Sequence, residues 1–565
     1  MSKGRDAKKS SLASGNFDGR SLVSRKLTRR QALSTAGKVA IGVVVAGVVA
    51  GVGGYLAGST AAPTTTVEKT IERTKTVERT IERTVTRTET VTVTGTAPPP
   101  ATVVTTPTFK LPSEEEMRRR IRAELERASI NWKKFAGKEI VISSPTHPFL
   151  DALKPLVPLF EDLTGIKVRI EELTEAEWNQ KVPTVLASGV PTYDIVFCGP
   201  IYLWGWGSAG WLETLDKYLN NPELTDKDWY DFNDFLPATI KVSRWNARPG
   251  APEGEGPLWM VPIMVETYLL AYREDLFKKW GLTAPGTWED LLETVKIVKT
   301  KMKEEGLYGK MYPLTLRGTR LFITVAAYTA VLPAYGARDL DENLVPLYDS
   351  KEWIEANKIY TEIIKEGCPP PSTFFSINWY NVLDDMAAGL YAMTIDCDFF
   401  AATWENPEKS KVAGKLAYTT VPAGPAGRGA RIWAWSLAIP KSSANKEAAW
   451  LFIEWATSKP ILWWSTVRYG NYMPVRWSVL NSPEVEAITK DWGHGTWREA
   501  VTEMYAKYTL GSYYTPLPEQ ITLLNIISDA LHDIVADKKT VEEALKWAKQ
   551  EAVKALKEAG YKLPV

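Results

Sequence analysis

Residues 138–198 alternate short apolar runs with helical segments, and this alternation constrains the fold more than any other feature. The runs 138–144, 166–171 and 193–198 are predicted strands, with one helix expected over 152–165 and a second ending at Ser188. Strands joined by helices at this spacing form a parallel, doubly wound sheet. Ligands of such sheets lie beyond the carboxyl ends of the strands. The loops 144–149 and 199–206 are therefore the first places to look for a site.

A second informative stretch is residues 261–298, VPIMVETYLLAYREDLFKKWGLTAPGTWEDLLETVKIV. It predicts a strand, a short helix, a Pro-Gly turn and another helix. Thr287 has the position of an N-cap, and Asp290 three residues later completes a capping box. No nucleophile motif, metal cluster or phosphate loop occurs in this stretch.

Composition narrows the class of function. The net charge of +1 argues against a nucleic-acid partner, which needs a basic stripe. No Walker motif is present, so the chain is not expected to hydrolyse nucleotide. Three histidines and three cysteines without a CxxC make a structural zinc site and any metal cofactor unexpected. Cys198 and Cys397 each follow a predicted strand and could pair, although buried free thiols are the favoured alternative.

The first 112 residues look like an address and a spacer. Residues 1–38 are polar and basic and are expected to be cytoplasmic, and residues 39–57 are uncharged and apolar. That run is long enough to cross a bilayer of about 30 Å. It is either a cleaved signal peptide or, the favoured interpretation, a retained membrane anchor with the body outside. Residues 58–112 form a Thr/Pro-rich tract containing the near-repeat TVEKTIERTK–TVERTIERTV, typical of a solvated stalk.

Several segments, in order, resemble one protein family. The stretch 261–298 resembles the hinge-crossing segment of family 1 extracellular solute-binding proteins, the maltose-binding-protein-like receptors of ABC importers. FEDLTGIKV (160–168), MAAGLYAMTI (386–395), AGPAGRGARIWAWSLAIP (423–440) and NKEAAWLFIEWATSKP (445–460) resemble successive later segments of that family. The resemblance covers roughly residues 138–556. Anchor and stalk together fit the membrane-tethered surface receptors of archaeal type.

The resemblance implies an α/β fold of two lobes with a cleft between them, the periplasmic-binding-protein-like type II fold. Residues 113–137 would be a lead-in helix capped by Ser113. Residues 138–262 would begin the first lobe, 263–390 the second, and 391–565 would return to complete both lobes and end in helices.

A neutral polyhydroxylated ligand needs aromatic faces for its C–H surfaces and charged acceptors for its hydroxyls. Loop position and the resemblance together nominate twelve ligand-binding candidates: Thr146, His147, Tyr202, Trp204, Trp206, Glu266, Asp396, Asp398, Phe399, Trp433, Trp435 and Tyr472. Other roles remain open for some of them. Asp396 could cap a following helix, the tryptophans at 433 and 435 could be core, and His147 could be a loop hydrogen-bonder.

The predicted function is that of a non-enzymatic receptor at the cell surface. Two lobes would close over a neutral sugar or oligosaccharide and pass it to an ABC permease. Maltose itself is not implied, because Cys397-Asp398 replaces the Gly-Pro of maltose receptors and residues 243–258 are additional. The alternatives are the same scaffold binding a cationic or peptide-like solute, a surface carbohydrate-active enzyme, and a purely structural surface protein.

Overall fold

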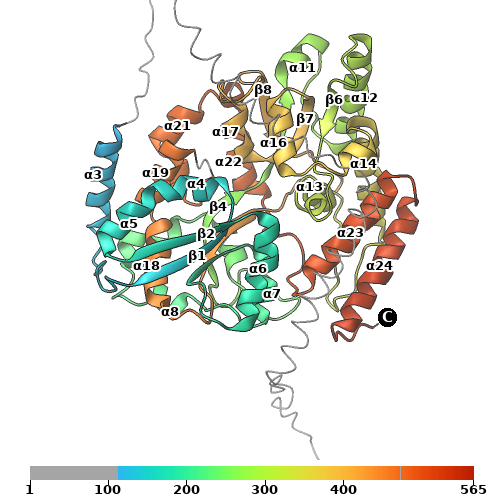
Figure 1. The fold of residues 1–565 in the computed structure, drawn as a ribbon. Helices are drawn as coiled ribbons and strands as arrows, with labels where there is room; N and C mark the ends of the chain where they lie inside the picture. The colour runs from blue at the N-terminus through green and yellow to red at the C-terminus, as the bar shows by residue number, and fades with distance from the viewer. Residues whose placement is uncertain (1–111, 471–472, 565) are drawn as a thin grey trace, which may run out of the picture.

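The computed structural model describes residues 112–470 and 473–564, which form two α/β lobes (Figure 1). The predictions for the basic segment, the apolar run and most of the stalk concern residues outside this part, as does the candidate Tyr472. Across the described ranges, no helix has both the length and the apolar character that crossing a membrane requires.

The first lobe is built on a five-stranded sheet of order β2-β1-β3-β9-β4. The three strands expected between 138 and 198 are present and mutually parallel, which confirms that part of the prediction. The later strand β9 runs antiparallel to both of its neighbours, so the sheet as a whole is mixed. The strands are β1 (Glu139–Pro145), β2 (Lys167–Leu173), β3 (Ile195–Cys198), β4 (Met260–Glu266) and β9 (Trp433–Ala438).

The second lobe is built on a four-stranded sheet of order β6-β7-β5-β8. β6 and β7 are parallel, whereas β5 is antiparallel to β7 and to β8. The strands are β5 (Tyr268–Arg273), β6 (Tyr312–Thr315), β7 (Tyr391–Cys397) and β8 (Leu416–Thr420).

The chain crosses between the lobes at segments that are hydrogen-bonded to one another. Thr267 alone separates β4 from β5, a few residues after the predicted division at 262/263. The second crossing, 421–432, is fixed to a later return segment where Ala430 N–H donates to Tyr508 O and Ile432 N–H to Gly511 O. These hydrogen bonds hold the second crossing and the return segment side by side at the hinge.

Helices surround both sheets (Figure 1). Those of the first lobe are α3 (Glu114–Leu125), α4 (Pro148–Leu153), α5 (Val157–Thr164), α6 (Glu175–Ser188), α7 (Pro200–Ser208), α8 (Asp216–Leu219), α9 (Lys227–Tyr230), α10 (Pro237–Ser243), α18 (Lys446–Ala456), α19 (Lys459–Tyr469), α20 (Trp477–Leu480) and α21 (Pro483–Thr489). Those of the second lobe are α11 (Glu274–Trp280), α12 (Trp288–Glu304), α13 (Tyr328–Ala334), α14 (Lys351–Gly367), α15 (Pro371–Phe374), α16 (Trp379–Ala387), α17 (Ala401–Trp404), α22 (Thr496–Glu503), α23 (Gln520–Val535) and α24 (Val541–Glu558).

Local sequence signals explain several helix ends. The Thr287 capping box is confirmed, since Thr287 Oγ1 accepts from Asp290 N–H at 3.0 Å and the Asp290 carboxylate accepts from Thr287 N–H at 3.1 Å. Ser113 caps α3, and Gly165 ends α5 with a φ of 71°. The expectation of a loop over 199–206 is wrong: Gly199 is the N-cap and Pro200 the first residue of α7. Proline suits that position because its missing N–H would have no helical partner there.

Candidate functional site

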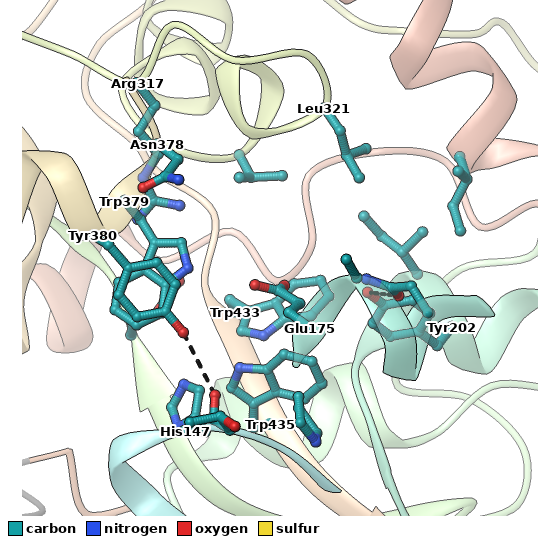
Figure 2. Close-up of a pocket in the computed structure, with 18 of the residues that line it drawn as sticks. His147, Glu175, Tyr202, Arg317, Leu321, Asn378, Trp379, Tyr380, Trp433 and Trp435 are labelled. Atoms are coloured by element: carbon teal, nitrogen blue, oxygen red, sulfur yellow. Dashed lines mark hydrogen bonds between the residues drawn. The ribbon is translucent and has the colours of Figure 1, made fainter. Parts of the chain in front are cut away.

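A cavity of about 370 Å³ lies between the two lobes. Its walls come from strand ends and helix starts of the first lobe, from the crossing segments, and from irregular segments of the second lobe (Figure 2). The lining residues are Pro145, Thr146, His147, Glu175, Ala176, Asn179, Ile201, Tyr202, Glu266, Arg317, Leu321, Val325, Asn378, Trp379, Tyr380, Phe399, Arg431, Trp433, Trp435 and Ile521.

The first-lobe wall is an aromatic platform. Trp433 and Trp435 alternate along β9, with ring centroids 5.3 Å apart and planes at 83°. The ring of Tyr202, from α7, lies 6.0 Å from each of them and stacks on Trp435 at 21°. Rings in such mutual contact have little freedom to turn, so they present fixed faces to the cavity.

A glycine allows the Trp433 ring to lie where it does. A Cβ on Gly199 would meet the Trp433 ring at 2.4 Å, closer than carbon atoms can approach. The indole of Trp433 therefore packs directly on the backbone at the start of α7. Position 199 must be glycine because any Cβ there would collide with the ring.

Two carboxyls face the cavity from the first-lobe side. Glu175 is the first residue of α6, at the carboxyl end of β2, and Glu266 is the last residue of β4. Burial raises the pKa of both carboxyls. A hydrogen bond from Trp379 opposes that shift at Glu175, and the nearby Arg317 opposes it at Glu266. Burial therefore makes the charged form of each carboxyl less favourable than it is in water.

His147 sits at the start of α4 as its N-cap. Its Nδ1 accepts from Phe149 N–H at 3.3 Å, which leaves the proton on Nε2. Burial lowers the pKa of His147 to about 3. The imidazole is therefore neutral at neutral pH and brings no charge to the site.

The second-lobe wall contains a guanidinium held from behind by a carboxylate. Arg317 Nε donates to Asp396 Oδ2 at 3.0 Å, and its Nη2 lies 2.9 Å from the Cys397 sulfur. Asp396 does not line the cavity, so it neutralises and orients Arg317 without reaching a ligand. The next residue, Gly318, must be glycine, because a Cβ there would lie 1.8 Å from the Phe374 carbonyl oxygen.

Arg431 lies in the second crossing and is 1% exposed. Its guanidinium sits over the Trp433 ring at 5.0 Å. Among the residues that the structure describes, none accepts a hydrogen bond from its Nε or Nη1. Buried donors of this kind are costly unless an acceptor reaches them.

The two lobes touch each other at the cavity edge. The hydroxyl of Tyr380, from α16, donates to the backbone oxygen of Thr146 at 3.5 Å (Figure 2). The ring of the neighbouring Trp379 lies 6.1 Å from His147. Side chains of both lobes therefore surround the same space.

Comparison with known proteins identifies the chain. Residues 145–461 match the family model described as bacterial extracellular solute-binding protein. The chain belongs to that family. This confirms the family-level prediction, and the curated relatives that it matches are solute-binding proteins.

Two relatives of this solute-binding protein bind sugar alcohols according to their names. The erythritol/L-threitol-binding protein of Mycolicibacterium smegmatis is 30% identical over 359 residues, covering 62% of this chain and 73% of that protein. The mannitol-binding protein of Pseudomonas aeruginosa is 27% identical, covering 61% and 73%.

Solved structures agree on the fold. A solute-binding protein of Agrobacterium vitis with bound D-mannitol has a TM-score of 0.61 and 26% identity, covering 75% of this chain and 100% of that one. One from Agrobacterium radiobacter in complex with ribitol has a TM-score of 0.64 and 23% identity, covering 74% and 99%. The two-lobed periplasmic-binding-protein-like fold is thereby confirmed.

The structure brings seven of the predicted site residues to the cavity: Thr146, His147, Tyr202, Glu266, Phe399, Trp433 and Trp435. Trp204 and Trp206 point elsewhere, because α7 turns them into the core, where they are 0% and 5% exposed. Asp396 binds Arg317. Asp398 is buried at the hinge, where it accepts from Thr267 N–H at 3.3 Å and from the Tyr505 hydroxyl at 2.9 Å.

The possible pairing of Cys198 and Cys397 is not formed. All three cysteines are buried free thiols. Cys198 lies at the end of β3 in the first lobe and Cys397 at the end of β7 in the second.

Several lining residues escaped the sequence argument although a signal existed for some. Glu175 follows β2 and Arg317 follows β6, both ends of parallel strands, to which the same topological rule applies. Asn378 caps α16 in a capping box with Asn381, which brings Trp379 and Tyr380 to the cavity edge. Arg431 had no local signal, because its role depends on what surrounds the crossing.

Proposed function

We propose that this protein is a cell-surface receptor that closes on a neutral sugar or sugar alcohol and delivers it to the permease of an ABC importer. The observation that carries this is Arg431, whose buried guanidinium has two nitrogens, Nε and Nη1, with no acceptor among the described residues. A ligand hydroxyl bound beside Trp433 would supply that acceptor, while the ring covers the ligand's C–H face.

The balance of charge supports a neutral ligand over a cationic one. The wall carries two carboxyls, Glu175 and Glu266, and two guanidiniums, Arg317 and Arg431. Asp396 neutralises Arg317 from outside the cavity. Burial raises the pKa of both wall carboxyls because it disfavours their charged forms, whereas a cation site relies on charged carboxylates.

Size and kinship favour a small ligand. A cavity of about 370 Å³ is near the lower end of the roughly 300–1,000 Å³ typical of ligand pockets. The relatives named for erythritol, threitol and mannitol bind solutes of four to six carbons. A sugar alcohol therefore fits better than a long oligosaccharide.

The N-terminal sequence supports a location of the receptor at the membrane surface. The apolar run 39–57 and the stalk 58–112 would hold the body outside the cell, an arrangement of archaeal type. Ligand contact with both lobes favours the closed arrangement, which the permease would recognise.

Calorimetry on the purified full-length chain tests the ligand class. Erythritol, ribitol, mannitol, maltose and the diamine putrescine would be titrated at low and high salt. Saturable, salt-insensitive binding of at least one polyol is expected. Binding of the diamine alone, weakened by salt, would assign the cavity to a cation instead.

The variant Arg431→Met links the binding to the observed geometry. Hydrogen bonds to a charged group contribute about 1.5–3 kcal/mol, so affinity for the bound polyol should fall roughly 10- to 100-fold. The melting temperature should stay level or rise, because an unsatisfied buried group is removed. Arg320→Met is the matched control, since that guanidinium pairs with Asp529 outside the cavity.

A further inference from the structure

One end of the cavity is aliphatic, and its character constrains the ligand of the proposed site further. Ile201, Leu321, Val325 and Ile521 are in the cavity lining, and α23, which carries Ile521, contacts both α7 and the turn 322–325. They come from α7 in the first lobe, from the segment after β6, and from α23. We call these four residues the aliphatic end.

The aliphatic end is built where the two lobes meet. Helix α7 packs against α23 across the lobes. A Cβ on Gly205 of α7 would lie 3.9 Å from the Pro518 carbonyl oxygen, just before α23 begins. Ile201 and Ile521 are thus brought together from opposite sides, and a ligand group between them would contact both lobes.

Leu321 is held in an unusual backbone conformation. Its φ is 64°, a region that non-glycine residues rarely adopt. The Ser528 hydroxyl accepts from its N–H at 3.0 Å, and its carbonyl accepts from Thr324 N–H at 3.0 Å and from the Thr324 hydroxyl at 2.5 Å. Strain of this kind persists where surrounding structure enforces it, and it is concentrated at binding sites. Here the hydrogen bonds to Ser528 and Thr324 hold Leu321 in the cavity wall.

Several hydrogen-bonding groups of the wall lie away from Leu321, whereas the hydrogen-bonded pair of Tyr202 and Asn179 lies on its side of the cavity (Figure 2). Figure 2 shows Leu321 and Tyr202 on one side of the cavity and His147, Asn378 and Trp379 on the other. The hydroxyl of Tyr202 already donates to Asn179 Oδ1 at 2.8 Å. A ligand hydroxyl placed among the four aliphatic side chains would therefore give up its water without finding a good partner.

We infer that the ligand is a polyol or sugar with one apolar terminus, such as the methyl group of a 6-deoxy sugar or its alditol. The inference rests on the proposed function, because it assigns the two ends of the same cavity. The hydroxylated part of the ligand would lie against Arg431, Glu266, Trp433 and Trp435. The methyl group would lie among Ile201, Leu321 and Ile521.

Matched pairs of alditols test the inference on the full-length chain. Galactitol and L-fucitol differ only in one terminal hydroxyl, as do D-mannitol and 6-deoxy-D-mannitol (D-rhamnitol). In at least one pair the deoxy member should bind about tenfold more tightly, the lower end of what one mismatched group is worth in an apolar pocket. Equal binding, or tighter binding of the parent alditol, overturns the aliphatic-end assignment and leaves the proposed function intact. Failure of every alditol and every sugar tested to bind removes both.

A pair of variants locates the effect. Ile521→Thr puts a hydroxyl into the aliphatic end and should reduce the preference for the deoxy alditol to nearly one. Ile526→Thr changes the same residue type on the same helix, partly buried but outside the cavity, and should leave the preference unchanged. A preference that survives Ile521→Thr places the methyl group elsewhere and contradicts the assignment.

Discussion

The two walls of the cavity are built in different ways. The first-lobe wall rests on regular elements, with Trp433 and Trp435 on β9 and Tyr202 on α7. The second-lobe wall rests on segments between elements, where Arg317 and Leu321 follow β6 and Asn378 caps α16. The first wall is shaped by ring packing, the second by hydrogen bonds and a buried ion pair. Substitutions in the two walls should therefore reduce stability and ligand affinity by different amounts.

The largest effect is expected where the second wall depends on its ion pair. Asp396→Asn leaves the buried Arg317 without its carboxylate, and breaking a buried pair costs about 3–5 kcal/mol of unfolding free energy. Ligand affinity should also fall, because Arg317 loses its orientation. Chemical denaturation and calorimetry would measure the two losses.

Asp398→Asn is the matched control, two residues away and equally buried. Its carboxyl accepts from Thr267 N–H, Phe399 N–H and the Tyr505 hydroxyl. An amide oxygen can accept from the two N–H groups, and the hydroxyl can turn to accept from the amide nitrogen. The cost should be about 1 kcal/mol. Equal losses of unfolding free energy from the two substitutions would show that the ion pair with Arg317 adds nothing to the stability contributed by Asp396.

The next effect tests the first wall. Trp433→Ala removes the central ring of the platform, and loss of a buried aromatic anchor costs about 2–4 kcal/mol of binding free energy. Affinity should fall roughly 30- to 1,000-fold while the fold persists, since Trp433 is only half-buried. Trp463→Ala, a half-buried tryptophan on α19, controls for general destabilisation. Similar affinity losses from both would mean that the platform is structural.

The difference between the walls also explains what the sequence could predict. Thr146, Trp433 and Trp435 sit on predicted strands or directly after one, where period and topology indicate which residues face a ligand. Arg317 follows a strand end and Asn378 begins a capping box, so local signals existed for both, whereas Leu321 depends on its contact with Ser528, 207 residues away in sequence. Such contacts exist only after both lobes have folded, and no local pattern reports them.

Misplaced predictions follow the same logic. Trp204 was expected in a loop, but the Gly-Pro start of α7 made a helix whose inner face is core. Asp396 and Asp398 were correctly placed near the end of β7, but burial and nearby donors gave them structural partners. The position of a residue relative to a strand could be predicted from the sequence. Which side chain or backbone group it hydrogen-bonds in the folded interior could not.

A pH dependence tests Glu266, the first-lobe carboxyl next to the first crossing. Burial raises the pKa of Glu266 in the folded protein. As pH rises from the ordinary carboxyl range, the folded chain keeps a proton that the unfolded chain has released, so stability falls until the raised pKa is passed. Glu266→Gln cannot titrate. Its melting temperature minus that of the wild type should therefore increase as pH rises from the ordinary carboxyl range, about pH 4, and level off once the raised pKa is passed. A difference that stays flat as pH rises would place Glu266 in a less buried setting.

The smallest effect concerns the contact that joins the walls directly. Tyr380→Phe removes only the hydroxyl that donates to the Thr146 carbonyl oxygen across the cavity edge. A long, half-exposed hydrogen bond contributes about 0.5–1 kcal/mol, so affinity should fall about two- to fivefold, through faster ligand dissociation. Stopped-flow dissociation rates would measure this. Tyr308→Phe is the control, because that tyrosine is similarly exposed on the second lobe and far from the cavity lining. Thr146 contributes only its backbone oxygen to this contact, so Thr146→Val should leave the dissociation rate unchanged. If Thr146→Val raised the rate as much as Tyr380→Phe does, the Thr146 side chain, and not the interlobe hydrogen bond, would retain the ligand.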